Sequence, residues 1–76
     1  MSRESREMTI REAAESSLRD RLGRLRGRKE LLKYVADLEH DAEILEGSPG
    51  LQDHAKWAEA YRWMAERARE AAQRSR

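Results

Sequence analysis

Gly23-Arg24-Leu25-Arg26-Gly27 is the stretch that decides the fold, because it separates two apolar stripes of different helical phase. The stripe before it has the spacing of one helix face: Ile10, Ala14, Leu18, Leu22 and Leu25. The stripe after it alternates steps of four and three: Leu31, Val35, Leu38, Ala42 and Leu45. If the first stripe continued past Leu25, its next positions would be Lys29 and Leu32, and neither belongs to the second stripe. The phase change, beside two glycines, predicts a turn near residue 27 between two helices.

Local signals indicate where the helices begin and end. Thr9 followed by Glu12 is typical of a capping box, so we expect the first helix to start at Thr9. Residues 1–8 repeat Ser-Arg-Glu and offer nothing apolar to bury, which favours a flexible N-terminal arm. Gly47-Ser48-Pro49-Gly50 should end the second helix. Ser48 suits the N-cap of a third helix and Pro49 its first turn.

The third helix again has apolar residues in steps of four and three: Trp57, Tyr61, Met64, Ala68 and Ala71. Three helices with short loops near residues 23–28 and 47–50 predict an all-α fold. It is either an up-down-up three-helix bundle or a helical homodimer, with residues 9–75 forming one domain. Folding about residue 27 brings Ile10 level with Ile44, so we expect Ile10 to cover that side chain.

Length and composition limit what the chain can be. A chain of 76 residues buries only about 60–65% of its unfolded surface, so its core is thin. It has no cysteine, which excludes disulfides and thiolate metal sites and makes a second chain the expected source of extra stability. No stretch approaches the roughly 18 apolar residues that span a bilayer. We therefore expect a cytoplasmic protein.

Charge is segregated along the chain although the net charge is only +1. Residues 19–29 hold six basic groups and one acidic group, whereas residues 30–54 hold one basic and seven acidic groups. The basic segment could bind nucleic acid or an acidic protein surface, or it could pair with the chain's own acidic helix. The residues that would contact nucleic acid are Arg21, Arg24, Arg26, Arg28 and Lys29.

The sequence offers little chemistry. His40 and His54 flank the second hairpin, but neither has a second histidine at helical spacing, as strong zinc motifs require. The serines fit helix and capping positions better than nucleophilic roles. We expect no metal, no cofactor and no enzymatic activity.

Trp63 stands out because it lies off the main stripe of the third helix, among charged residues. Aromatic and arginine residues are the usual anchors of protein interfaces, so Trp63 with Arg62 and Arg67 predicts a protein-binding surface. Alternatively, the first helix covers Trp63 from the side. The leading interpretation is a small protein-binding module, acting as a regulator, inhibitor or adaptor of a larger protein. The alternatives are a nucleic-acid binder and a self-associating coiled-coil component.

Overall fold

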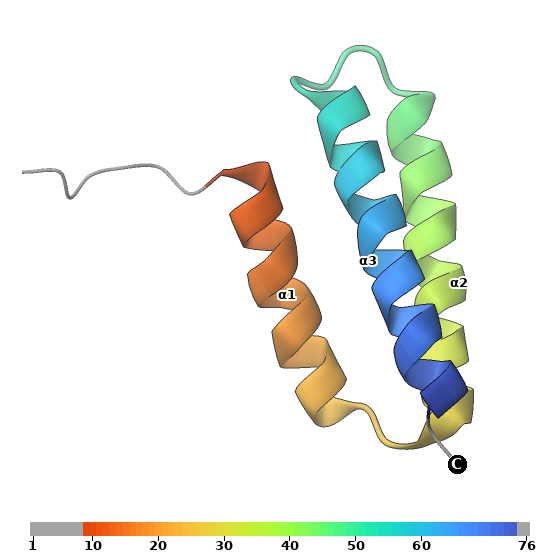
Figure 1. Ribbon diagram of the computed structural model, residues 1–76. Helices are drawn as coiled ribbons and strands as arrows, with labels where there is room; N and C mark the ends of the chain where they lie inside the picture. The colour runs from red at the N-terminus through yellow and green to blue at the C-terminus, as the bar shows by residue number, and fades with distance from the viewer. Residues whose placement is uncertain (1–8, 75–76) are drawn as a thin grey trace, which may run out of the picture.

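A computed structural model describes residues 9–74, which form three helices: α1 (Ile10–Arg24), α2 (Gly27–Glu46) and α3 (His54–Arg74). The helices alternate in direction, and α3 lies between α1 and α2 (Figure 1). The predicted all-α class and up-down-up bundle are thereby confirmed. The proposed arm at residues 1–8 and the end of the proposed 9–75 domain lie outside the described residues.

The N-terminus of α1 is fixed by the capping box expected from the sequence. The Glu12 backbone N–H donates to the Thr9 hydroxyl at 3.1 Å, and the Thr9 N–H donates to the Glu12 carboxylate at 3.0 Å. Two N–H groups that a helix start leaves unpaired are satisfied in this way.

The connection between α1 and α2 consists of only Leu25 and Arg26, at the predicted place. The Leu25 N–H donates to the Arg21 carbonyl at 2.9 Å and closes the last turn of α1. Gly27 then reverses the chain with a φ of 84°, in the left-handed region that glycine enters without a steric penalty. The expected turn is therefore real, and Gly27 makes it possible.

The connection between α2 and α3 is longer than the predicted loop at 47–50, because α3 begins at His54. The prediction that Ser48 caps α3 is wrong: its hydroxyl donates to the Ile44 carbonyl at 2.7 Å and so satisfies the end of α2. Asp53 precedes α3 in the left-handed region, with a φ of 58°. The His54 ring lies 3.0 Å, through Nδ1, from the Leu45 carbonyl and ties the start of α3 to the end of α2.

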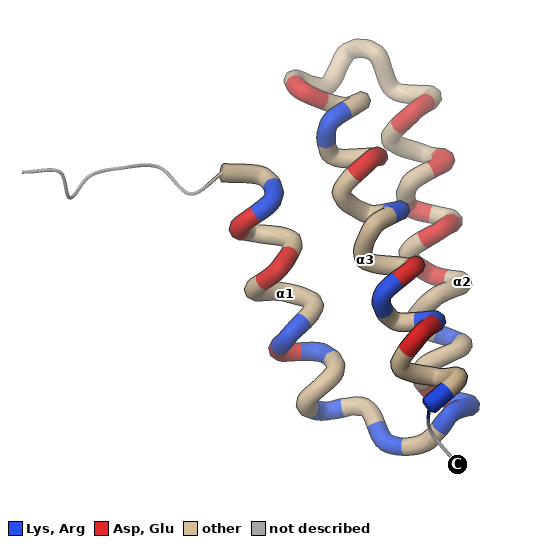
Figure 2. The backbone as a smooth tube through the Cα atoms, in the orientation of Figure 1, with Lys and Arg blue, Asp and Glu red and all other residues tan. Residues whose placement is uncertain are grey.

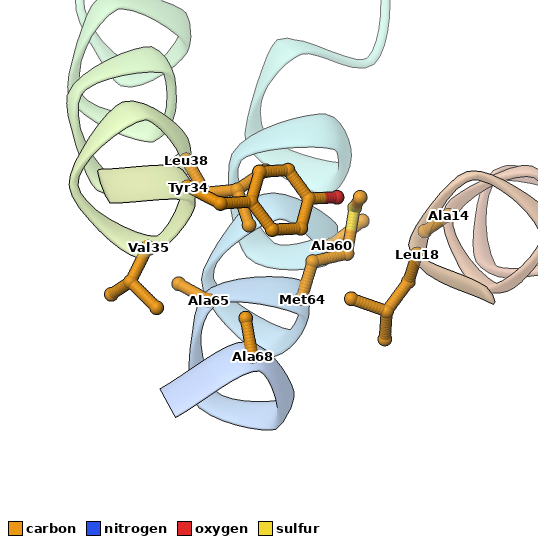
Figure 3. Close-up of a cluster of buried hydrophobic side chains, with 9 residues drawn as sticks. All are labelled: Ala14, Leu18, Tyr34, Val35, Leu38, Ala60, Met64, Ala65 and Ala68. Carbon is orange, nitrogen blue, oxygen red and sulfur yellow. The ribbon is translucent and has the colours of Figure 1, made fainter. Parts of the chain in front are cut away.

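The tightest packing joins α2 and α3. Alanines at seven-residue intervals on α3, at positions 58, 65 and 72, are buried against the stripe that the sequence predicts for α2. Small side chains let two helix backbones approach closely. Figure 3 shows the adjoining cluster, in which Tyr34 reaches from α2 over Met64 toward Leu18 of α1.

The first helix packs on α3 far more than on α2. Ala14 and Leu18 are its only buried residues, compared with five on α2 and six on α3. The expectation that Ile10 covers Ile44 is wrong for this reason: Ile10 lies beside Ala60 and Trp63 of α3, and Ile44 remains 53% exposed.

Candidate protein-docking surface

Trp63 lies on the side of α3 that faces α1, where it is half-buried against the core cluster. The Arg11 guanidinium of α1 stacks over the indole at 4.1 Å from the ring centroid, and that of Arg67 lies at 5.7 Å. A cation held over a tryptophan face is attracted by the ring's negative π surface. Residues of the first helix thus cover much of Trp63.

The two arginines grouped with Trp63 by the sequence lie on different sides of α3. Arg67 remains close to Trp63 and pairs with Glu70 at 3.2 Å. Arg62 points instead to α2, where it pairs with Glu46 and holds the pKa of that carboxyl below its usual range. The structure does not bring Trp63, Arg62 and Arg67 onto one continuous surface.

The arginine-rich segment forms one end of the molecule, around the α1–α2 connection (Figure 2). Arg21 stacks over the Tyr34 ring at 4.8 Å, and Arg24 lies 3.5 Å from the Asp20 carboxylate. The remaining three cations of the predicted set are exposed and form no ion pair with another described residue: Arg26, Arg28 and Lys29. This basic turn, residues 19–29, keeps uncommitted positive charge.

Tyr34 connects all three helices beneath that basic end. Its hydroxyl is buried without a hydrogen-bond partner of normal geometry among the described residues. Burial raises the pKa of the Tyr34 phenol, and the nearby Arg21 guanidinium and Ser17 hydroxyl offset this only in part. A neutral, buried phenol is a packing group here rather than a reactive one.

An apolar surface lies at the other end, where α2 meets α3. Leu45, Leu51, Trp57 and Tyr61 line a shallow depression of about 360 Å³, and we call these four residues the hairpin patch. Trp57 and Tyr61 meet edge to face with ring centroids 6.4 Å apart, an arrangement that fixes both rings. Leu51 is 54% exposed in the loop. Four large apolar side chains thus meet at this depression, three of them half-buried and Leu51 exposed.

Acidic residues surround this patch. Asp41 lies one helical turn before Leu45 and shares its face of α2, whereas Asp37, one turn further back, lies in a depression beside the basic turn. Asp53 lies in the loop between Leu51 and Trp57. Neither Asp41 nor Asp53, which we call the acidic rim, forms an ion pair with a described residue. The patch therefore favours an apolar segment that carries positive charge beside it.

A larger depression, of about 520 Å³, lies between α1 and α3 and includes Ile10 and Trp63. Its walls also hold charged side chains: Arg11, Lys56 and Glu59. Thr9, the first residue that the structure describes, also lines this depression, whereas the hairpin patch lies well within the described residues. The hairpin patch is the better candidate because it combines exposed apolar area with an unpaired charged border.

Sequence reasoning missed this surface because Trp57 and Tyr61 lie on the regular apolar stripe of α3. A stripe predicts burial, but here Trp57 and Tyr61 are only half-buried, whereas Met64 and Ala68 further along the stripe are buried. The available signal was the position of Leu51, a large apolar residue in a Gly-Ser-Pro-Gly loop with no helical phase.

Comparison with known protein families, curated proteins and solved structures gives no significant match. The described helices include none with the length and apolar character needed to cross a membrane. Function must therefore be argued from this chain's own surface.

Proposed function

We propose that this chain is a non-enzymatic protein-binding module that docks its partner on the hairpin patch. The observation that carries the proposal is the cluster of Leu45, Leu51, Trp57 and Tyr61 around an open depression. Interface energy is concentrated in a few aromatic and aliphatic anchors within a polar border, and this surface has both.

The acidic rim specifies the chemistry of the partner. Carboxylates beside an apolar patch attract a segment with basic residues flanking its apolar anchors and repel an acidic one. The predicted role as a regulator, inhibitor or adaptor is consistent with a small chain whose binding surface lies at one end.

Nucleic-acid binding by the basic turn is the second candidate. Three uncommitted cations, Arg26, Arg28 and Lys29, support it. The acidic α2 runs directly from that turn, however, and would repel a phosphate backbone along its length. Phosphate binding would fall steeply between about 50 and 200 mM salt, whereas an apolar patch would lose much less affinity.

The test is capture from a nuclease-treated lysate of the source cell, with the wild-type chain and two matched variants. Leu51→Gln places an amide in the hairpin patch. Leu32→Gln makes the same change at a residue that is 43% exposed and lies outside the hairpin patch. We expect a discrete protein that Leu32→Gln retains and Leu51→Gln loses.

The opposite result has two forms. If both variants retain the captured protein equally, the hairpin patch is not the docking surface. A parallel capture from untreated lysate tests the second candidate. If it recovers nucleic acid alone, and high salt removes it, the function belongs to the basic turn.

A further inference from the structure

The chain itself contains a segment of the chemistry that the hairpin patch requires. Leu25 is half-buried within the basic turn, where it lines a depression with Arg21 and Lys33. This inference rests on the proposed function, because it names the partner of the same surface. We propose that the partner is a second copy of this chain, docked face to face and antiparallel.

Charge selects the antiparallel orientation. The basic turn and the hairpin patch lie at opposite ends of the molecule, with α2 running from one to the other (Figures 1 and 2). A parallel pair would place two basic turns together and two acidic rims together. An antiparallel pair brings each basic turn to the end of the other copy that carries the α2–α3 loop, where Asp53 lies, and a two-fold axis provides this contact twice.

The register follows from the length of α2. A two-fold axis through the middle of this 20-residue helix places Gly27 of one copy level with Glu46 of the other. Leu45 then lies level with Arg28 of the second copy, at the edge of its basic turn. Lys33 lies level with His40 of the second copy, one residue from Asp41.

Lys33 and Asp41 are suited to face each other across the axis. Lys33 lines a depression with Tyr34 and Asp37, on the face of α2 that continues to Asp41 and Leu45. Both side chains are exposed, and neither forms an ion pair with a described residue of its own chain. Two copies therefore gain two ion pairs without breaking one that exists within the monomer. The same register places the two Asp37 carboxylates beside the axis, so their repulsion opposes this gain.

The monomer also gains from such a partner. Its first helix buries only Ala14 and Leu18, fewer residues than either other helix. Small domains without disulfides commonly obtain the missing burial by oligomerising. Docking over the hairpin patch and over the depression at Leu25 would cover Trp57 and Tyr61 at one end of the molecule and Leu25 at the other.

The first experiment is sedimentation equilibrium of the full chain over a wide range of protein concentration. We expect a monomer–dimer equilibrium that shifts toward monomer as salt is raised. Leu51→Gln should weaken the dimer about tenfold, and Leu32→Gln should leave it within about twofold of wild type. Circular dichroism of each variant confirms that its helices are intact.

A charge exchange tests the register. Lys33→Glu alone and Asp41→Lys alone should each weaken the dimer about tenfold or more, because the two-fold axis applies each repulsion twice. An equimolar mixture of the two variants, or a single chain with both substitutions, should restore association. Association that stays weak in both the mixture and the double variant would overturn the proposed orientation.

A wild-type chain that remains monomeric at every concentration would overturn the second-copy proposal alone. The docking function would still be supported if lysate capture yields a protein that Leu51→Gln loses. If Leu51→Gln does not weaken the dimer, the hairpin patch is not part of the dimer contact and the second-copy proposal is overturned. If lysate capture is also unaffected by Leu51→Gln, the proposed function is refuted as well.

Discussion

At the residue scale, Trp63 shows that a side chain among charged residues of its own helix need not be exposed in the folded protein. Its neighbours on α3 are charged, yet α1 brings Arg11 over the ring and apolar side chains beside it. The alkyl stem of an arginine covers apolar surface while its charged group remains in water. The indole is therefore part of the contact that holds α1 on α3.

Replacing Trp63 with alanine tests this interpretation. We expect the free energy of unfolding to fall by about 2 kcal/mol, less than the roughly 3–5 kcal/mol typical of a fully buried tryptophan. Urea unfolding followed by circular dichroism measures it, with Trp63→Phe as a control that keeps a ring under Arg11 and should lose less than half as much. Unchanged stability would return Trp63 and its neighbour Arg67 to the candidate binding residues.

At the scale of the elements, two glycines four residues apart have opposite roles. Gly23 lies inside α1 with open space where a Cβ would be, so glycine there only weakens the helix. Gly27 has equally open surroundings, but its φ of 84° penalises any side chain. Backbone conformation, rather than crowding, separates the two positions.

Alanine substitutions should therefore have opposite signs. We expect Gly23→Ala to stabilise the protein by about 0.5–1 kcal/mol, because helical alanine loses less backbone entropy than glycine. Gly27→Ala should destabilise it by about 1–2 kcal/mol through left-handed strain. Thermal and urea unfolding of both variants provide the comparison, and a stabilising Gly27→Ala would show that the tight turn at Gly27 is not kept in solution.

At the scale of the whole molecule, the bundle consists of a tight α2–α3 hairpin and a first helix attached to one side of it. Native-state hydrogen exchange should show α1 amides opening at a lower free energy than the central amides of α2 and α3, because α1 buries the fewest residues. The measurement should be made at low protein concentration, where dimer formation would not add protection to the amides. Equal protection in all three helices would mean that the molecule unfolds as one unit.

The molecule's charge is also organised at this largest scale. A basic end and an acidic end give a nearly neutral chain a strong polarity along α2 (Figure 2). Such polarity favours recognition in one orientation over uniform attraction to a polyanion. It is the reason why the same residues support both the proposed docking chemistry and the antiparallel register.

The sequence by itself determined the number and direction of the helices, the capping box at Thr9 and the turn at Gly27. These features depend on contacts within a few residues, and hydrophobic period, capping and glycine report such contacts directly. Tertiary structure alone decided that α1 packs on α3, that Arg62 pairs with α2 and that Trp57 and Tyr61 remain open. A helical stripe shows that a face is apolar but does not say which helix covers it, because that choice depends on side chains far apart in the chain. The late start of α3 has the same origin, since the α2 carbonyl at Ile44 accepts from the Ser48 hydroxyl that was expected to cap α3.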